Sequence, residues 1–276
     1  MRVIRVEGTG FDAVDYADAV GPVTRSLPYS LRVLAENVIR QDGTAELVSH
    51  VANRDGGAVP FRPSRLILQD MLGLPLMVDV MAMRSAVTEA GGDPSQIDLT
   101  LPVDLVIDHA MTVNHWAEKF ALTKNEAREF EINHERFAFL KACEARFPSL
   151  RVIPPGGGIM HQVNLEYLGR VVSPTEAGSN LLAPDTNLGT DSHTTMINGL
   201  GILGWGIGGL EAEAIIFGES TSLNVPRVIG LEVSGTMPDV TGIWLDLRVL
   251  PDRCEYHPVS EGDRAHAGTC GDGGGL

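Results

Sequence analysis

Three adjacent side chains near the middle of the chain, Asp191, Ser192 and His193, differ in their hydrogen-bonding chemistry. They offer a carboxylate, a hydroxyl and an imidazole, a combination that a packed apolar core does not require. A glycine-rich apolar segment, residues 200–209, follows them and allows close approach of backbone to backbone, at a cost in stability that packing or function must offset. The pattern is typical of a small-anion site, although Asp-Ser-His also occurs as an ordinary capping turn.

Four further polar residues follow short apolar runs. They are Gln69 after residues 65–68, Asp108 and His109 after residues 103–107, and His161 after residues 150–153 and a glycine loop. Ligands of open α/β sheets collect outside the carboxyl ends of the strands, so we expect these four residues where such a fold binds its ligands. Each has a structural alternative: Gln69 as a helix cap, Asp108–His109 as a buried hydrogen-bonded pair, and His161 as a loop histidine.

The hydrophobic pattern predicts the elements that position these residues. Helical spacing predicts helices at residues 28–41, 75–90, 123–147 and 210–217. Short apolar runs predict strands at residues 65–68, 103–107, 150–153 and 228–233. Because strands alternate with helices, we expect an α/β fold whose largely parallel sheet is covered on both faces.

Composition restricts the partners and the compartment. The chain has 276 residues and a formal net charge of −15, which argues against nucleic acid or an anionic membrane as a partner. It has neither a run of about 18 apolar residues nor a signal-peptide core. Three widely spaced cysteines give no disulfide framework. We therefore expect a cytoplasmic protein.

Five segments of the chain resemble the aconitase family, in the branch of aconitase A and the iron-regulatory aconitases. They are residues 27–40 (LPYSLRVLAENVIR), 65–73 (RLILQDMLG), 103–109 (VDLVIDH), 153–168 (IPPGGGIMHQVNLEYL) and 189–209 (GTDSHTTMINGLGILGWGIGG). They occur in the family's order and at similar spacing, from about residue 27 to about residue 241. The resemblance implies an aconitase-type three-layer α/β/α domain over residues 1–241.

The resemblance also implies a reaction, the interconversion of citrate and isocitrate through cis-aconitate in the tricarboxylic acid cycle. Hydroxide is a poor leaving group unless a metal ion binds its oxygen and an acid donates a proton to it. Carried over by motif, Asp108 and His109 would tune the proton donor, and His161 would support the same network. Gln69 and residues 191–193 would contact the carboxylates and the hydroxyl of the substrate.

In the family, three cysteines of a later domain hold a 4Fe–4S cluster, and the substrate-clamping arginines also lie in later segments. Here Cys143 falls inside a predicted helix, Cys254 and Cys270 are sixteen positions apart, and no Cys-x-x-Cys occurs. We expect no cluster or metal to be held by this chain alone. A separate chain with the missing domains is therefore a candidate partner, beside a small tricarboxylate substrate.

The resemblance ends near Thr241. Residues 242–276 have no sustained periodicity and finish in a glycine run, so we expect a divergent, disordered tail, typical of a truncated or frameshifted reading frame or of a short paralogue. Three functions stay open: the N-terminal part of an aconitase-family hydro-lyase, inactive alone; a related hydratase acting on 2-methylisocitrate or another citrate analogue; and a non-catalytic α/β remnant or interaction module.

Overall fold

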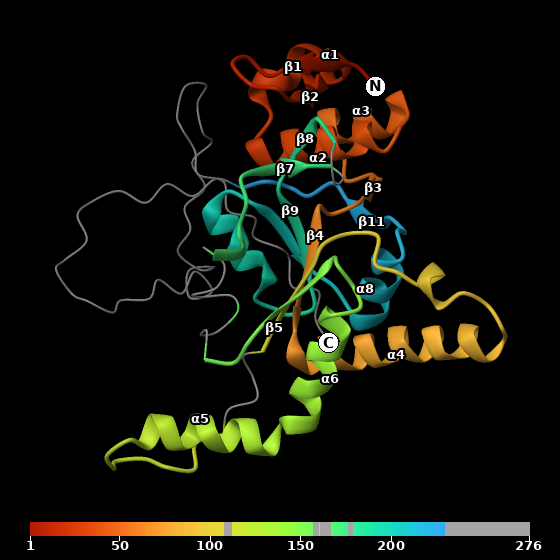
Figure 1. The fold of residues 1–276 in the computed structure, drawn as a ribbon. Coiled ribbons are helices and arrows are strands. Elements are labelled where there is room, and N and C mark those ends of the chain that lie inside the picture. The colour runs from red at the N-terminus through yellow and green to blue at the C-terminus, as the bar shows by residue number, and fades with distance from the viewer. Residues whose placement is uncertain (108–111, 157–159, 161–166, 176–178, 230–276) are drawn as a thin grey trace.

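The computed structural model describes residues 1–107, 112–156, 160, 167–175 and 179–229. At its centre is a five-stranded sheet of order β10-β9-β4-β5-β6, in which every neighbouring pair is parallel. Its strands are β4 (Arg65–Gln69), β5 (Val103–Val106), β6 (Leu150–Ile153), β9 (Thr186–Gly189) and β10 (Leu203–Gly206) (Figure 1). The prediction of an α/β fold with a largely parallel sheet is confirmed, and three of its strands lie where the apolar runs placed them.

Alternate residues of β4 enter two different cores, as the two-residue period of a strand requires. Leu66 and Leu68 join the larger core, on the face of the sheet that the helices cover. The helices that contribute to this core include α2 (Tyr29–Arg40), α3 (Ala45–Asn53), α4 (Asp70–Glu89), α6 (His134–Glu144) and α8 (Gly209–Ile216). Helices predicted at residues 28–41 and 210–217 are thus confirmed as α2 and α8.

Ile67 points to the opposite face and joins a smaller core. Its buried members are Ile67, Val106, Met160, Leu168, Ile197 and Ile202. Ile197 belongs to η3 (Thr194–Leu200), the short helix that follows the Asp-Ser-His triplet. The sheet is therefore covered on both faces, and the triplet leads directly into the second layer.

Helix α4 begins five residues earlier than its spacing predicts, at Asp70 in place of Pro75. Near its start Gly73 lies against the sheet: a Cβ there would come within 2.9 Å of Leu105 Cδ1 and 3.0 Å of Leu68 Cβ. Among the described residues, α4 alone is long and apolar enough to cross a membrane. Leu76, Met77 and Val80 of the same helix are buried in the core, so we read α4 as a packing helix.

The predicted long helix over residues 123–147 is wrong, because the structure has two helices there. α5 (Ala121–Ile132) and α6 meet at Asn133. The Asn133 Nδ2 donates to the carbonyl of Glu129 at 3.1 Å, and such a bond back to the preceding turn competes with helix continuation. Leu140 and Phe147 are buried, whereas Phe130 is exposed.

The remaining elements form two small sheets and short helices. β1 (Val3–Arg5), β2 (Asp12–Val14), β8 (Leu181–Pro184) and β7 (Val172–Pro174) form a sheet in that order, and β3 (Ala58–Phe61) pairs with β11 (Thr221–Asn224). The others are α1 (Tyr16–Val20), η1 (Gly21–Ser26) and η2 (Pro94–Gln96). Of the strand predicted at 228–233, Val228 and Ile229 belong to no strand, and residues 230–233, like the tail 242–276, lie outside the described residues.

Candidate functional site

Two neighbouring strands, β4 and β9, bring predicted site residues to one edge of the sheet. β4 ends at Gln69, and β9 ends two residues before Asp191. The Gln69 Nε2 donates a hydrogen bond to the carbonyl oxygen of Thr190 at 3.2 Å. Gln69 is the N-cap residue of α4 but makes no side-chain capping bond to the helix. Its side-chain amide instead bonds to the residue that follows β9.

Within the triplet, Asp191 organises both of its neighbours. Its Oδ1 accepts from the backbone N–H of His193 at 2.6 Å and lies 2.8 Å from His193 Nδ1. The Ser192 Oγ is 3.3 Å from the same ring nitrogen. The carboxylate therefore caps the turn and also fixes the imidazole, because a neutral ring that donates from Nδ1 carries its lone pair on Nε2. The capping and the functional interpretations thus describe one geometry.

Glycines allow the backbone around the triplet to pack closely. A Cβ on Gly206 would lie 3.0 Å from the Asp191 carbonyl oxygen, and one on Gly204 would lie 2.4 Å from Ile197 Cγ2. At Gly189 it would lie 2.5 Å from Thr194 Oγ1. Side chains at these three positions would push β9, β10 and η3 apart. The glycines thus permit the close approach of backbone segments that the glycine-rich segment predicts.

Acidic side chains lie close to the same edge. Asp70, the residue after Gln69, is buried and pairs with Arg136 Nη2 at 3.5 Å. Burial, followed by the carboxylates of Asp70 and Glu126, raises the pKa of the Glu129 carboxyl. An anionic ligand at this edge would therefore need cations to offset the acidic charge.

Three predicted residues, Asp108, His109 and His161, lie outside the described residues. Strand β5, which precedes Asp108 and His109 in the chain, stands next to β4 in the sheet, and β6, which precedes His161, stands next to β5. Their roles therefore stay predictions.

The described residues do not fit a metal cluster. They contain no group of three or more His, Cys, Asp or Glu side chains arranged to hold a metal ion. Cys143 is buried in α6, and burial raises the pKa of its thiol to about 11. A thiol of that kind is a poor ligand because binding requires the thiolate.

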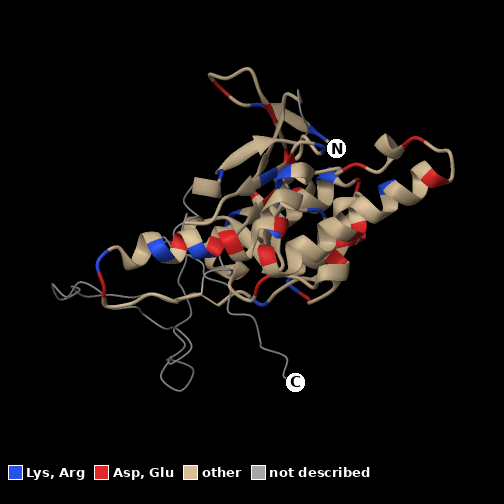
Figure 2. Ribbon diagram, turned by 60° about the horizontal axis from the view of Figure 1, so that its bottom comes forward, with Lys and Arg blue, Asp and Glu red and all other residues tan. Residues whose placement is uncertain are grey.

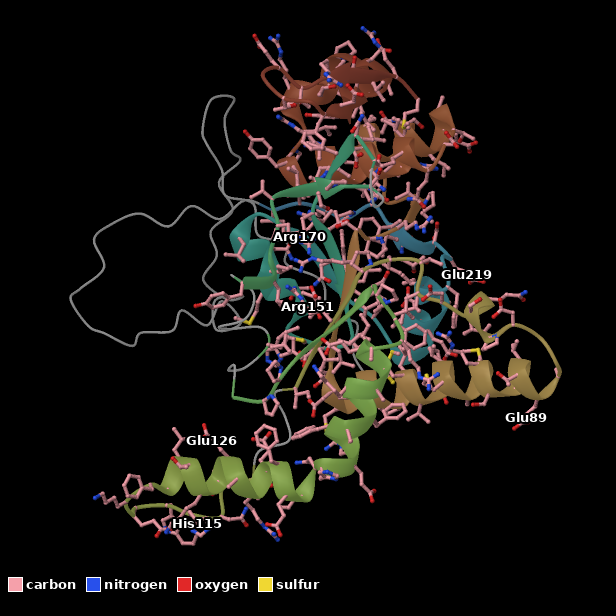
Figure 3. The ribbon with its side chains drawn as sticks, in the orientation of Figure 1. Glu89, His115, Glu126, Arg151, Arg170 and Glu219 are labelled. Carbon is pink, nitrogen blue, oxygen red and sulfur yellow. The ribbon has the colours of Figure 1, made fainter. Side chains whose placement is uncertain are left out.

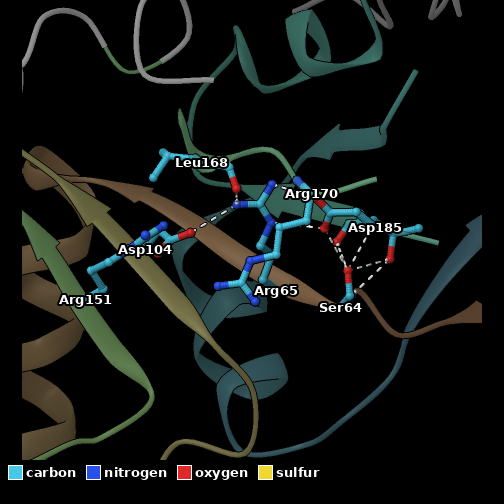
Figure 4. Close-up of polar contacts among 8 residues, drawn as sticks. Ser64, Arg65, Asp104, Arg151, Leu168, Arg170 and Asp185 are labelled. Carbon is cyan, nitrogen blue, oxygen red and sulfur yellow. Dashed lines mark hydrogen bonds and ion pairs between the residues drawn. The ribbon is translucent and has the colours of Figure 1, made fainter. Parts of the chain in front are cut away.

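Sequence reasoning missed a buried ion network at the opposite end of the strands. Arg65, at the start of β4, bonds to Asp185, and its Nη1 lies 3.0 Å from Asp104 Oδ2 (Figure 4). The Ser64 Oγ and the Arg170 backbone N–H also donate to Asp185, at 3.0 and 2.7 Å. The signal was available: a charge inside an apolar strand, as in the sequence Val-Asp-Leu-Val, requires a partner when it is buried.

Comparison with known proteins gives consistent matches over most of the chain. Residues 38–243 match the profile of the Aconitase family (aconitate hydratase). The chain is 48% identical over 233 residues to aconitate hydratase A of Deinococcus radiodurans, which covers 81% of this chain and 26% of that protein. It is 47% identical over 231 residues to the Escherichia coli K12 protein of that name, with 80% and 26% covered. The chain thus spans about a quarter of the length of these relatives.

Proposed function

The chain belongs to the aconitase family, and we propose from this premise that it forms one wall of a hydro-lyase site for a small tricarboxylate. The reaction proposed for the complete site is the interconversion of citrate and isocitrate through cis-aconitate. The observation that carries this proposal is the carboxyl edge, where Gln69 bonds to Thr190 and Asp191 holds His193. An amide and a hydroxyl there can donate to carboxylate oxygens, and an oriented imidazole can accept from a hydroxyl group.

Each side chain of the edge has a proposed role. Gln69 and Ser192 would donate hydrogen bonds to the carboxylates of the substrate, and the lone pair on His193 Nε2 would accept one from its hydroxyl group. Asp191 would keep the His193 ring in one tautomer and direction, so that its Nε2 lone pair faces the substrate. Asp108, His109 and His161 are proposed for the network that delivers a proton to the departing hydroxyl.

We propose weak binding and no turnover for this chain by itself. The buried carboxylate of Asp70 directly follows Gln69, and carboxylates near the edge disfavour a trianion. Cys143, the cysteine among the described residues, is buried and a poor ligand, so we propose that the 4Fe–4S cluster of the family is held by other family segments. A separate chain that carries the remaining family segments is the proposed partner. The division into a domain over residues 1–241 and a tail over 242–276 likewise stays a proposal.

Titration of the isotope-labelled chain with citrate tests the binding proposal. We expect amide shifts at Gln69 and residues 191–193, with a Kd in the millimolar range, near −4 kcal/mol. Glycerol, which resembles the citrate backbone without its carboxylates, is the matched control ligand and should shift none of these amides. A Gln69→Ala variant should weaken the response at Thr190. Absence of shifts at these positions in saturating citrate would show that the edge has no carboxylate site of its own.

A further inference from the structure

Helix α5 exposes its apolar side chains and buries its polar ones. Asn125, Glu129 and Asn133 recur every four residues and are only 5–6% exposed. On the other sides of the helix, Leu122, Phe130 and Ile132 are 64%, 52% and 55% exposed. A helix of a lone globular domain has the opposite pattern, with apolar residues toward the core. The apolar side of α5 therefore lacks cover within the described residues.

The segment before α5 adds to this apolar surface. Residues 112–133, here named the α5 arm, comprise a loop and α5, and the arm stands apart from the body of the protein (Figure 1). Asn125 Oδ1 accepts from the backbone N–H groups of Asn114 and His115, and Asn125 Nδ2 donates to the His115 carbonyl at 2.8 Å. His115 and Glu126 lie on opposite sides of the arm (Figure 3). The buried amide thus locks loop and helix into one unit.

The loop of the arm presents further large apolar side chains to solvent. Val113, Trp116 and Phe120 are 66%, 72% and 66% exposed. Phe120 also has a φ of 64°, a left-handed conformation that is unusual for a bulky residue. An aromatic side chain has about 150–250 Å² of surface, so the exposed fractions of Trp116, Phe120 and Phe130 together correspond to roughly 400 Å². The three aliphatic residues bring this surface toward the about 800 Å² per partner of an ordinary interface.

The charges of the arm are largely paired within it. Glu118 binds both His115 and Lys124 at 2.6 Å, and Arg128 binds Glu131 at 2.6 Å. The arm has three Lys or Arg and four Glu and is near neutrality, whereas the whole chain carries −15. Residues of both signs are interspersed along α5 (Figure 2). A partner of the arm therefore needs apolar surface and no particular charge. A second arm offers that surface, and because both arms are near neutrality, the contact between them brings together little charge of one sign.

We propose that the α5 arm is a self-association surface, through which two copies of this chain pair arm to arm. Such a contact is isologous, with the same surface contributed by each copy. Because its centre is apolar and the bodies repel each other, added salt should strengthen it, in contrast to a contact held by ion pairs.

Sedimentation velocity of the purified chain over a range of concentrations, in low and high salt, tests this proposal. We expect a monomer–dimer equilibrium whose Kd falls as salt rises. Trp116→Ser should weaken it about 30-fold, as loss of a central aromatic anchor does. Leu122→Glu, a second variant at an exposed position, should leave a monomer because it places two carboxylates together in the contact.

The matched control is Val171→Ser, which changes a side chain that is 84% exposed next to β7, away from the arm. This variant should dimerise like the parent chain, and thermal unfolding should show that all three variants fold alike. A chain that stays monomeric at every concentration and salt level would overturn the proposal. A dimer that Trp116→Ser and Leu122→Glu leave intact, or that Val171→Ser weakens equally, would overturn it as well.

Discussion

Arg65 and Asp185, which are 120 residues apart in the chain, form a two-pronged ion pair inside the protein. Arg65 Nε donates to Asp185 Oδ1 at 3.0 Å, and Nη2 donates to Oδ2 at 2.8 Å. Both side chains are almost completely buried. Because Arg65 begins β4 and Asp185 directly precedes β9, the pair fixes these two strands side by side. Their carboxyl ends then bring Gln69 next to Thr190.

Removal of one member of this pair should lower the free energy of unfolding much more than removal of a half-exposed arginine. Asp185→Asn leaves the buried Arg65 without its bidentate partner, so we expect the free energy of unfolding to fall by about 3–5 kcal/mol. Arg151→Ala is the control, because the Arg151 guanidinium bonds to Asp104 at 2.7 Å but its side chain is 49% exposed. We expect that change to cost about 1 kcal/mol or less. Urea unfolding followed by circular dichroism measures both, and equal losses would contradict this account.

A second prediction concerns Asn187 of β9. The residue is fully buried, and neither its Nδ2 nor its Oδ1 has a hydrogen-bond partner among the described residues. Leucine has nearly the shape of asparagine and no polar atoms. Asn187→Leu should therefore raise the free energy of unfolding by about 1–2 kcal/mol, since it removes the desolvation cost of an unpaired amide. Thermal and urea unfolding of the variant give the measurement, and a destabilised variant would instead reveal a polar role for the amide.

The same strand shows where sequence reasoning stopped. Apolar runs predict β4, β5 and β6 because most of their residues are Leu, Ile or Val. Strand β9 has no such run, because it contains Asn187 and Gly189. What makes β9 a strand is pairing with β4 and β10, a contact between distant segments that local propensity does not encode. In the same way, the position of Gln69 after an apolar run predicts a residue at the sheet edge, and the polar triplet predicts Asp191 as a site residue. The bond from Gln69 to Thr190 depends on β4 and β9 being neighbours, which only the sheet order reveals.

A third prediction follows from the burial of Cys143. With its pKa raised to about 11, only about one thiol in a thousand is ionised at pH 8. Iodoacetamide should therefore alkylate Cys143 at least about 100-fold more slowly in the native chain than in the urea-unfolded chain. Mass spectrometry of the peptide that contains Cys143 follows the reaction with time. Labelling at the same rate in both states would show that α6 opens readily and leaves the thiol accessible.

The last prediction concerns pH and the polar side of α5. Burial and then the carboxylates of Asp70 and Glu126 raise the pKa of Glu129 above its ordinary value of 4.5. The native state therefore holds the Glu129 proton more tightly than the unfolded state does. Well below pH 4.5 the ionisation of Glu129 does not affect the free energy of unfolding. This free energy falls as pH rises from the unfolded-state pKa to the folded-state pKa of Glu129, and it stays reduced at higher pH.

Glu129→Gln removes the ionisation and keeps the size of the side chain. The variant should match the parent chain in unfolding free energy near pH 4 and exceed it at pH 7, with a gap that opens as pH rises. Glu131→Gln, which changes the exposed partner of Arg128, is the matched control and should open no such gap. Urea unfolding at a series of pH values gives the comparison. A Glu129→Gln variant less stable than the parent at pH 7 would mean that the buried carboxylate is held by favourable contacts, and that the polar side of α5 is stabilised by its charge.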